Sequence, residues 1–519
     1  MLLPYSPEAL TDFSQPGQQE AFRAALDKAA ADLGRTFPLI IGGKPVATAA
    51  TYASINPSRP AEAVGHFSKG DAQSAADAIT AAAAAFETWQ YTPVSERVRY
   101  LLHAAAELRR RKHEFSAVMV YEVGKSWAEA DADTSEAIDF LEYYARQALR
   151  LLDSSDQLAP YPAEQLSLTY IPLGVGAIIP PWNFALAIPM GMVAAVLVTG
   201  NTAILKPAGQ SPYIAWLLCE LFWNAGLPAG VLNFVTGPGS VVGSALVNDP
   251  RTRFINFTGS REVGCQIYEQ MAKVQPGQKW LKRATLEMGG KDAVLVDETA
   301  NAEAAAQGIV ASAFGFQGQK CSAGSRAILV DGIYDAVATR VVELTKQLTI
   351  GAPDQSVQID QGPVVDASAM NKIMEYIEIG TQEGELLTGG HRLETPEGGY
   401  FIEPTVFGEV PGDARIAQEE IFGPVLALIR ARDFEHAIEI ANSTDYGLTG
   451  AVFSARRDRL EKARAEFHVG NLYFNRKCTG AMVGVHPFGG FNMSGTDSKA
   501  GGPDYLLLFS QAKSVAERL

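Results

Sequence analysis

The sequence predicts an α/β protein in which helices cover parallel β-sheets. Three observations support this fold class. From Gly174 onward, short apolar segments alternate with helix-like segments, as in sheets built from repeated strand and helix units. Glycine, proline and small polar residues stand at the ends of the apolar segments, where strand-to-helix turns are expected. The chain has 519 residues, enough for two or three domains.

The composition argues against several classes of protein. Hydrophobic residues make up 47% of the chain and charged residues 19%, which is typical of a globular protein. No apolar run reaches the roughly 18 to 20 residues that a membrane span requires, and the N-terminus lacks the features of a signal peptide. We therefore expect a soluble cytoplasmic protein without an integral membrane segment.

The net charge, the cysteines and the histidines argue against a nucleic-acid partner, disulfides and a metal site. The net charge of −15 argues against a nucleic-acid partner, and the one basic run, Arg109 to Lys112, is interpreted as the solvated end of a helix. The cysteines at positions 219, 265, 321 and 478 have no disulfide or C-x-x-C spacing, so we expect them reduced. The seven histidines form no H-E-x-x-H motif, and no metal site is expected.

The first 170 residues predict mainly helices. A helix is expected over residues 18–33, followed by a β-hairpin over residues 37–47 that turns at Gly42 and Gly43. Apolar residues at helical spacing predict three long helices, at residues 71–89, 95–111 and 129–152. Residues 166–170 follow a segment rich in proline and serine, and they predict a strand that pairs outside its own domain.

The middle of the chain predicts a parallel sheet. Strands are expected at residues 175–179, 202–205, 231–235 and 254–258, and helices at 187–198, 213–225, 239–247 and from 262 onward. The turns after three of these strands are Pro181 to Phe184, Lys206-Pro207 and Thr258 to Ser260. Ligands of parallel sheets bind beyond the carboxyl ends of the strands, so these turns should face one crevice. A second block of strands and helices runs from about Glu287 to Gly484.

Cys321 is the candidate nucleophile. It stands among glycines and polar residues in the stretch Gly315 to Gly324, between a helix-like segment and the strand-like residues 327–330. A thiolate at such a turn could attack a carbonyl group. Cys219 lies inside an apolar helix instead and is interpreted as a core residue.

Two other residues could assist that chemistry. Glu287 ends an apolar strand, where partial burial would raise its pKa toward that of a general base; a capping or salt-bridged carboxylate is the alternative. Asn183, beside Trp182, could donate its amide N–H to a developing oxyanion, although alone it would be an ordinary turn residue.

A further set of residues could bind phosphate or ribose groups. Gly259 and Ser260 follow a strand and open a helix, so their N–H groups could contact a pyrophosphate. Lys206 ends another strand and could reach ribose hydroxyls or a phosphate. The run Gly237-Pro238-Gly239 is not a true G-x-G-x-x-G motif and is also explained as an ordinary turn.

Six motifs in this order resemble the aldehyde dehydrogenase superfamily over about residues 36 to 515. They are Pro181 to Phe184, Phe257 to Ser260, Leu286 to Lys291, Gly318 to Cys321, Glu420 to Pro424 and Pro487 to Gly490. The resemblance implies an aldehyde dehydrogenase-like α/β fold. Its parts would be a Rossmann-type dinucleotide-binding domain (1–151 and 174–285), an α/β catalytic domain (286–485) and a small β oligomerisation extension (152–173 and 486–519).

Two runs, Phe316 to Ala323 and Tyr473 to Gly484, resemble the pyrroline-5-carboxylate dehydrogenase branch of that superfamily. This resemblance implies NAD(P)-dependent oxidation of L-glutamate γ-semialdehyde to L-glutamate, the second step of proline degradation. The implied cofactor is NAD. NADP should also be tolerated, because Gly209 stands where family members often carry a glutamate that repels a 2′-phosphate.

The resemblance also implies roles for single residues. Cys321 would attack the aldehyde, Asn183 would hold the oxyanion, and Glu287 would deprotonate the water that hydrolyses the thioester. The implied cofactor-binding residues are Trp182, Lys206, Gly259, Ser260, Glu420 and Phe422. The implied substrate-binding residues are Phe184, Ser322, Gly480, Ala481 and Phe488. Glu136 and Lys320 resemble an ion pair that gates the site.

Three alternatives stay open at this point. The chain could act on another small ω-semialdehyde, against which the anchor formed by Ser322, Gly480 and Ala481 argues. It could transfer the acyl group to a thiol such as coenzyme A, although Glu287 favours hydrolysis. It could also be a non-catalytic protein on the same fold, but both Cys321 and Glu287 are present.

Partner subunits are expected from the C-terminal tail. Tyr505 to Phe509 is apolar enough to seek a partner, so we expect a homodimer or an assembly of dimers. The chain is too short to carry a proline-oxidising domain as well, so a proline dehydrogenase would be a separate protein. Pro180 and Ala185 depart from the family pattern around Asn183, and Cys478 stands two residues before Gly480.

Overall fold

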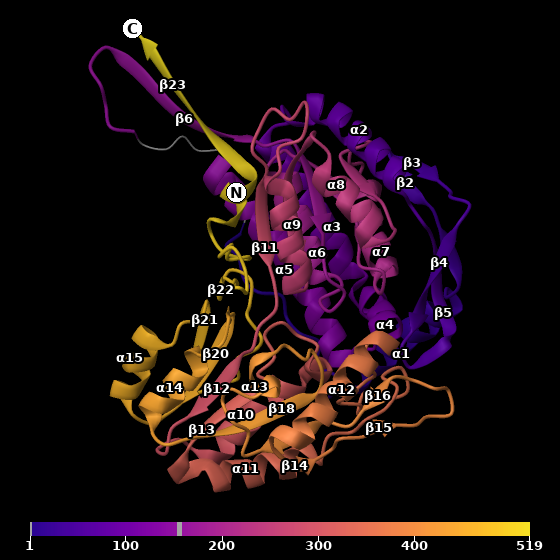
Figure 1. The fold of residues 1–519 in the computed structure, drawn as a ribbon. Helices are drawn as coiled ribbons and strands as arrows, with labels where there is room; N and C mark the ends of the chain where they lie inside the picture. Colours follow the sequence, from indigo (N-terminus) through magenta and orange to yellow (C-terminus); the bar gives the residue numbers. More distant parts are fainter. Residues whose placement is uncertain (1–2, 153–157) are drawn as a thin grey trace.

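The computed structural model describes residues 3–152 and 158–519, and its described part contains two seven-stranded sheets covered by helices (Figure 1). The two sheets occupy the upper and lower parts of Figure 1, and a two-stranded ribbon projects from the upper part. Among the described helices, none combines the length and the apolar character that crossing a bilayer requires.

The first sheet has the strand order β11-β10-β7-β8-β9-β2-β3. Its strands are β2 (Leu39–Ile41), β3 (Lys44–Val46), β7 (Val175–Ile179), β8 (Thr202–Leu205), β9 (Leu232–Phe234), β10 (Thr252–Thr258) and β11 (Arg283–Glu287). The five strands from β11 to β9 are parallel, whereas β2 pairs antiparallel with β9 and β3. The predicted strands at residues 175–179 and 202–205 and the hairpin are thereby confirmed.

The register of the first sheet aligns the carboxyl ends of its strands. Thr258 lies opposite Glu287, and Phe257 lies opposite Ile179. The three predicted turns and Glu287 therefore lie along one edge of the sheet, as expected for a parallel sheet.

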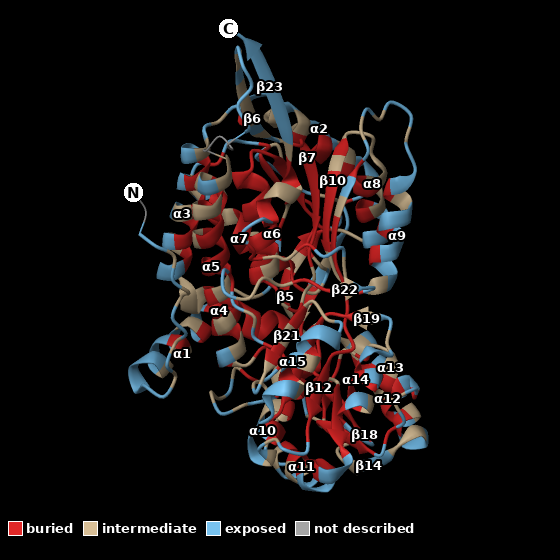
Figure 2. Cartoon of the chain, turned by 90° about the vertical axis from the view of Figure 1, so that its left-hand side faces the viewer, coloured by how far each residue is buried: buried red, intermediate tan, exposed pale blue. Residues whose placement is uncertain are grey.

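Among the described residues, nine helices lie around this sheet, some against its strands and some against other helices. They are α1 (Pro16–Ala31), α2 (Ala72–Trp89), α3 (Val94–Arg110), α4 (Lys112–Val123), α5 (Trp127–Leu152), α6 (Ala187–Val198), α7 (Pro212–Asn224), α8 (Ser244–Asn248) and α9 (Arg261–Ala272), with a π-helical turn at Gly239–Gly243. The sequence did not predict α4, which begins one residue after the end of the expected helix. Burial is concentrated in the sheets and in α5 and α6 (Figure 2).

The basic run lies at the junction of α3 and α4, and every charge in it is paired. Arg109 contacts Glu8 at 2.9 Å, and Lys112 contacts the buried Asp131 at 3.0 Å. Arg110 and Arg111 pair with Glu107 and Glu114. These pairs support the interpretation of the run as a helix end.

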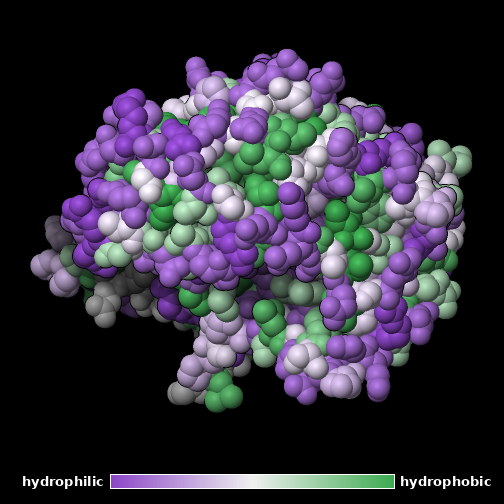
Figure 3. Space-filling model, turned by 90° about the horizontal axis from the view of Figure 1, so that it is seen from below, coloured by the Kyte–Doolittle hydropathy of each residue, from purple (hydrophilic) through white to green (hydrophobic). Residues whose placement is uncertain are grey.

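The second sheet has the order β14-β17-β18-β13-β12-β20-β21 and is parallel except for β14. Its strands are β12 (Ala293–Val296), β13 (Arg326–Val330), β14 (Glu385–Thr388), β17 (Thr405–Gly408), β18 (Val425–Ala431), β20 (Thr449–Phe453) and β21 (Asn471–Phe474). Its helices are α10 (Ala302–Phe314), α11 (Asp331–Thr345), α12 (Ala367–Glu383), α13 (Arg415–Gln418), α14 (Phe434–Asn442) and α15 (Arg457–Glu466). The face seen from below is mainly hydrophilic, with hydrophobic side chains in separate areas (Figure 3).

Small sheets complete the fold. They comprise β1 (Arg35–Phe37), β4 (Thr51–Asn56) and β5 (Arg59–Ser68), the pair β15 (Arg392–Leu393) and β16 (Phe401–Ile402), and the pair β19 (Tyr446–Gly447) and β22 (Phe491–Asn492). The projecting ribbon pairs β6 (Glu164–Pro172) antiparallel with β23 (Ser510–Arg518). The predicted strand at residues 166–170 thus does pair away from both large sheets.

The apolar tail does not behave as expected. Tyr505, Leu506 and Phe509 lie in a 3-10 helix (Tyr505–Phe509) and are buried within their own chain. Tyr505 stacks on Tyr144 of α5, with ring centroids 5.5 Å apart. The apolar character of this segment is therefore no argument for a partner subunit, because Tyr505, Leu506 and Phe509 are already buried in the core of their own chain.

Candidate active site

Cys321 lies at the end of a strained turn that follows α10. Phe316, Gln317 and Gly318 all have positive φ angles, of 50°, 55° and 67°. A side chain at Gly318 would place its Cβ 2.2 Å from the Gly423 carbonyl oxygen, so only glycine fits there. This turn carries the chain from the end of α10 to Cys321, whose side chain is partly exposed.

Two cavities meet at Cys321. We call them the Glu136 cavity and the Trp182 cavity after one residue that lines each. Cys321, Thr258 and Met288 line both cavities. A group bound in one cavity and a group bound in the other would therefore both reach the sulfur of Cys321.

The resting thiol of Cys321 is protonated at neutral pH. Burial, together with the carboxylates of Asp292, Glu420 and Glu287, raises the pKa of the thiol, because each disfavours the thiolate. The backbone N–H of Ser322 acts in the opposite sense. The thiol must therefore lose its proton when it reacts.

Glu287 is the carboxylate suited to accept a proton. Burial raises the pKa of Glu287 to about 7, against the hydrogen bond from Ser498, which favours the charged form. Its second oxygen, Oε2, is buried and has no hydrogen-bond partner among the described residues. Gly495 forms an isolated β-bridge with Glu287, and this contact brings the segment carrying Ser498 against β11. A free oxygen and a pKa near neutrality are the properties of a general base.

Asn183 is buried at the carboxyl edge of the first sheet, in the wall of the Trp182 cavity. Its amide nitrogen donates a hydrogen bond of 3.0 Å to the Gln319 carbonyl oxygen, two residues before Cys321. An amide group has two N–H donors, so this bond fixes the side chain and leaves a second N–H for another acceptor.

The Trp182 cavity unites five of the six residues predicted to bind the cofactor. Those residues are Trp182, Gly259, Ser260, Glu420 and Phe422. The Trp182 and Phe422 rings meet edge to face, with centroids 5.6 Å apart. Ser260 caps the 12-residue helix α9, whose N-terminal N–H groups and positive dipole end favour an anion such as pyrophosphate.

Two glycines, Gly289 and Gly290, make room for the carboxylate of Glu420 in this cavity. A Cβ at Gly289 would fall 2.2 Å from Oε2 of Glu420, and the Gly290 N–H donates a 3.1 Å hydrogen bond to the other oxygen. Glu420 can therefore approach the backbone closely and accept hydrogen bonds from ligand hydroxyls. The residues of this cavity fit a dinucleotide.

Lys206 lies at the end of β8 and does not line the Trp182 cavity in the described structure. Its ammonium group donates a 2.9 Å hydrogen bond to the Pro207 carbonyl, and burial lowers the pKa of Lys206 to about 8. A buried ammonium group without a carboxylate partner among the described residues suits polar ligand oxygens. Nothing lies within 4 Å of a Cβ placed on Gly209.

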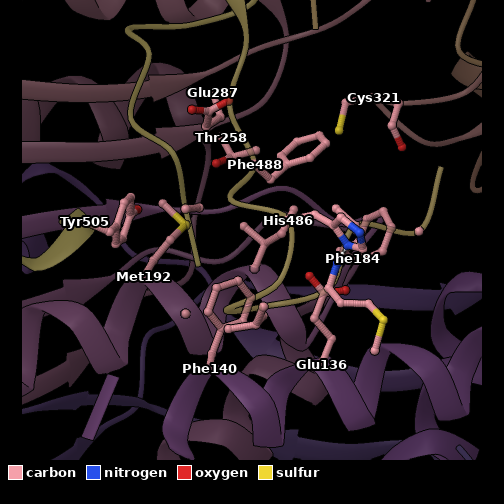
Figure 4. A pocket seen from close by; sticks show the side chains of 18 of the residues that line it. Glu136, Phe140, Phe184, Met192, Thr258, Glu287, Cys321, His486, Phe488 and Tyr505 are labelled. Atoms are coloured by element: carbon pink, nitrogen blue, oxygen red, sulfur yellow. Dashed lines mark hydrogen bonds between the residues drawn. The ribbon is translucent and has the colours of Figure 1, made fainter. Parts of the chain in front are cut away.

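The Glu136 cavity is lined by all five residues predicted to bind the substrate, namely Phe184, Ser322, Gly480, Ala481 and Phe488. Figure 4 shows Cys321 and Glu287 toward one end of the cavity and Glu136 and Phe140 toward the other. Gly480 has a φ angle of 79°, so the backbone turns there without a side chain in the way. Aromatic walls with polar groups at both ends suit a short, polar aldehyde.

The expected gate pair is wrong. Lys320 forms its ion pair with Glu129, at 2.6 Å, and not with Glu136. The two glutamates are seven residues apart on α5, so both lie on the same face of the helix. The Lys320 ammonium group bonds to Glu129, which lies about two turns before Glu136. Glu136 lines the cavity instead, and burial together with the charge of Asp133 raises the pKa of Glu136 to about 8.

Several residues of the site gave no local signal in the sequence. Ser498 is 211 residues from Glu287, and no pattern connects the two. Lys125 follows the glycine that ends α4, yet it is fully buried in an ion pair with Asp133 at 2.7 Å. Its ammonium group lies 4.7 Å from the ring centroids of both Phe184 and Phe316. A glycine-lysine pair after a helix ordinarily indicates an exposed helix end.

Comparisons with known proteins agree with this geometry. The model of the aldehyde dehydrogenase family matches residues 46–515. The 1-pyrroline-5-carboxylate dehydrogenase of Geobacillus thermodenitrificans (strain NG80-2) is 60% identical over 517 residues, and the one of Bacillus mycoides (strain KBAB4) is 55% identical over 519 residues; each comparison covers 100% of both chains.

Solved structures give the same result. The 1-pyrroline-5-carboxylate dehydrogenase from Thermus with bound NAD has a TM-score of 0.98 at 53% identity and covers 100% of both chains. Proline utilization A (PutA) from Bdellovibrio bacteriovorus has a TM-score of 0.97 at 44% identity and covers 99% of this chain but 53% of that one. The chain therefore belongs to the aldehyde dehydrogenase family.

Proposed function

We propose that this chain oxidises L-glutamate γ-semialdehyde, the open form of 1-pyrroline-5-carboxylate, to L-glutamate with NAD, the second step of proline degradation. The observation that carries the proposal is the position of Cys321 between the Glu136 and Trp182 cavities. The relatives named 1-pyrroline-5-carboxylate dehydrogenase, one of them with bound NAD, support it.

Cys321 is the proposed nucleophile. Its sulfur bonds to the aldehyde carbon, and the carbonyl oxygen becomes an oxyanion. The thiol proton leaves to solvent, to which Cys321 is partly exposed, so Glu287 stays unprotonated for the later hydrolytic step. The oxyanion accepts hydrogen bonds from the second amide N–H of Asn183 and from the backbone N–H of Cys321, a type of contact worth roughly 3 kcal/mol in acyl-transfer sites.

The proposed cofactor residues are Trp182, Lys206, Gly259, Ser260, Glu420 and Phe422. When bound, NAD supplies the acceptor for the hydride that leaves the aldehyde carbon. Ser260 and the start of α9 would hold the pyrophosphate, and Glu420 would hold a ribose. The open space beside Gly209 leaves room for a 2′-phosphate, so we propose that NADP is also accepted.

Glu287 then completes the reaction. The oxidised substrate is a thioester on Cys321, and its hydrolysis requires an activated water. The free Oε2 of Glu287 is the proposed proton acceptor for that water. The carbon–sulfur bond breaks, the product leaves as a carboxylate, and the thiol regains a proton.

The far end of the Glu136 cavity determines the substrate class. We propose that Ser322, Gly480 and Ala481 donate hydrogen bonds to the α-carboxylate of the substrate, while Phe184 and Phe488 pack against its methylenes. Glu136, which its pKa of about 8 leaves mainly protonated at pH 7, would ionise when the α-ammonium group enters beside it. A buried carboxylate with a raised pKa gains free energy when a cation enters beside it.

The wider setting is also a proposal. Residues 1–151 and 174–285 form the dinucleotide-binding domain, 286–485 the catalytic domain, and 152–173 with 486–519 an oligomerisation extension. We propose a homodimer or an assembly of dimers, because the β6–β23 ribbon is largely exposed.

The four free cysteines support a cytoplasmic location. A separate proline dehydrogenase would supply the substrate.

The test is the rate of cofactor reduction with L-glutamate γ-semialdehyde, succinate semialdehyde and propanal, each with NAD and with NADP. We expect kcat/KM for the glutamate compound to exceed the others by about two orders of magnitude or more, with L-glutamate as product. Equal kcat/KM values for the three aldehydes would exclude the proposed anchor.

A further inference from the structure

The N-terminal segment, residues 3–15, is bound along α5. The backbone N–H of Glu8 donates a 2.7 Å hydrogen bond to Asp139, and the backbone N–H of Thr11 donates a 2.8 Å hydrogen bond to Asp131. Lys112 adds a 2.9 Å hydrogen bond to the Ala9 carbonyl. These contacts hold the segment in one register on the helix.

Tyr5, near the start of this segment, reaches across to a distant part of the chain. Its hydroxyl donates a 2.8 Å hydrogen bond to the Val483 carbonyl oxygen, 478 residues away. Its ring packs edge to face on Tyr143 of α5, with centroids 5.1 Å apart. A Cβ at Gly484 would fall 2.9 Å from the Tyr5 ring and 2.8 Å from Tyr143, so a glycine lets the loop approach both rings.

Val483 belongs to the anchor loop, which we define as residues 480–486. Gly480, Ala481, Met482, Val483 and His486 of this loop all line the Glu136 cavity. The loop is held further by a 2.9 Å hydrogen bond from the Gly484 N–H to the Gly501 carbonyl and by bonds within itself. Among the described residues, no helix or strand lies within residues 480–486, so the position of the loop depends on such contacts.

We propose that Tyr5 is a positioning residue for substrate recognition: the N-terminal segment holds the anchor loop, and the loop holds the polar end of the substrate. This inference rests on the proposed function. Tyr5 does not line the cavity, so it acts through Val483 and Gly484. Tyr5 therefore influences the binding of substrates that contact the anchor loop, and it leaves the chemical step at Cys321 unchanged.

The test is the variant Tyr5→Phe, which removes the hydroxyl and keeps the ring. Loss of the Val483 hydrogen bond, together with the contact between the Tyr5 hydroxyl and Asp139, predicts a rise of about threefold to tenfold in KM for L-glutamate γ-semialdehyde. The kcat for that substrate and the kcat/KM for propanal should stay within about twofold, since propanal has no groups for the loop. Ser6→Ala is the matched control, because among the described residues the Ser6 hydroxyl bonds only the neighbouring Pro7 carbonyl.

A second readout does not depend on the substrate. Hydrogen exchange of the amides in residues 480–486, measured by mass spectrometry without ligand, should be faster in Tyr5→Phe than in wild type and in Ser6→Ala. Unchanged exchange and unchanged KM would overturn the inference, as would an equal loss of kcat/KM for both aldehydes. If wild type fails to oxidise the glutamate compound, the proposed function fails, and the exchange measurement still decides the role of Tyr5.

Discussion

The buried ion pair between Lys125 and Asp133 provides a quantitative test of how this site is held together. Both side chains are fully buried, and their charged atoms are 2.7 Å apart. Asp133 also accepts a 2.7 Å hydrogen bond from the Ala187 N–H at the start of α6. The Lys125 ammonium group lies over Phe184 of the Glu136 cavity and over Phe316 of the turn before Cys321.

Breaking the pair on one side should be costly. In Lys125→Met a carboxylate stays buried without its cation, and in Asp133→Asn an ammonium group stays buried without its anion. Removal of one partner of a buried pair typically lowers the free energy of unfolding by about 3–5 kcal/mol. The double variant leaves no unpaired charge, and asparagine can still accept the Ala187 hydrogen bond. We expect its loss to fall short of the sum of the single losses by at least about 2 kcal/mol.

Urea-induced unfolding of the wild type, both single variants and the double variant measures this coupling. The single variants should also show a lower kcat with L-glutamate γ-semialdehyde, because Phe316 precedes Cys321 in the strained turn. Single losses below about 1 kcal/mol, or additive losses in the double variant, would refute the argument that this charge pair determines the local structure.

Four other substitutions have defined outcomes. Cys321→Ala should abolish turnover and keep NAD binding by calorimetry; residual turnover would exclude the thiol mechanism. Glu287→Gln should give a burst of reduced cofactor followed by slow turnover, and it should lack the rise in rate with pH that we expect of wild type near pH 7, where the base becomes deprotonated. Gly209→Glu should lower kcat/KM for NADP more than for NAD, and equal effects would contradict the role of the open space. Gly318→Ala should lower the free energy of unfolding by at least about 1–2 kcal/mol, because its φ angle is 67° and the Gly423 carbonyl blocks a Cβ; unchanged stability would show that the turn relaxes.

Local patterns predicted the elements that depend on nearby residues. The strand Val175–Ile179 and the helix Ala187–Val198 begin and end where expected, because buried apolar runs and their turn residues lie within one segment. The parallel arrangement of the strands could then be inferred. It places the predicted turns and Glu287 together at the carboxyl ends of the first sheet. The end of α3 was predicted within one residue, whereas the helix α4 that follows it at once was not predicted.

Contacts between distant residues could not be predicted in the same way. The ion pair of Lys320 with Glu129 and not Glu136 depends on how the turn approaches α5. The burial of Tyr505 depends on Tyr144, far away in the sequence. Tyr5, Ser498 and Lys125 each receive their role from a tertiary contact, and no spacing in the sequence indicates it.

The central step of the proposed reaction is a covalent intermediate at Cys321 that is hydrolysed with the help of Glu287. The most direct measurement is acid quenching of the Glu287→Gln variant after mixing with L-glutamate γ-semialdehyde and NAD, followed by peptide mass spectrometry. We expect a glutamyl thioester on the peptide that contains Cys321, and a much smaller amount in wild type. Formation of L-glutamate at the wild-type rate by Glu287→Gln, with no adduct on Cys321, would contradict it.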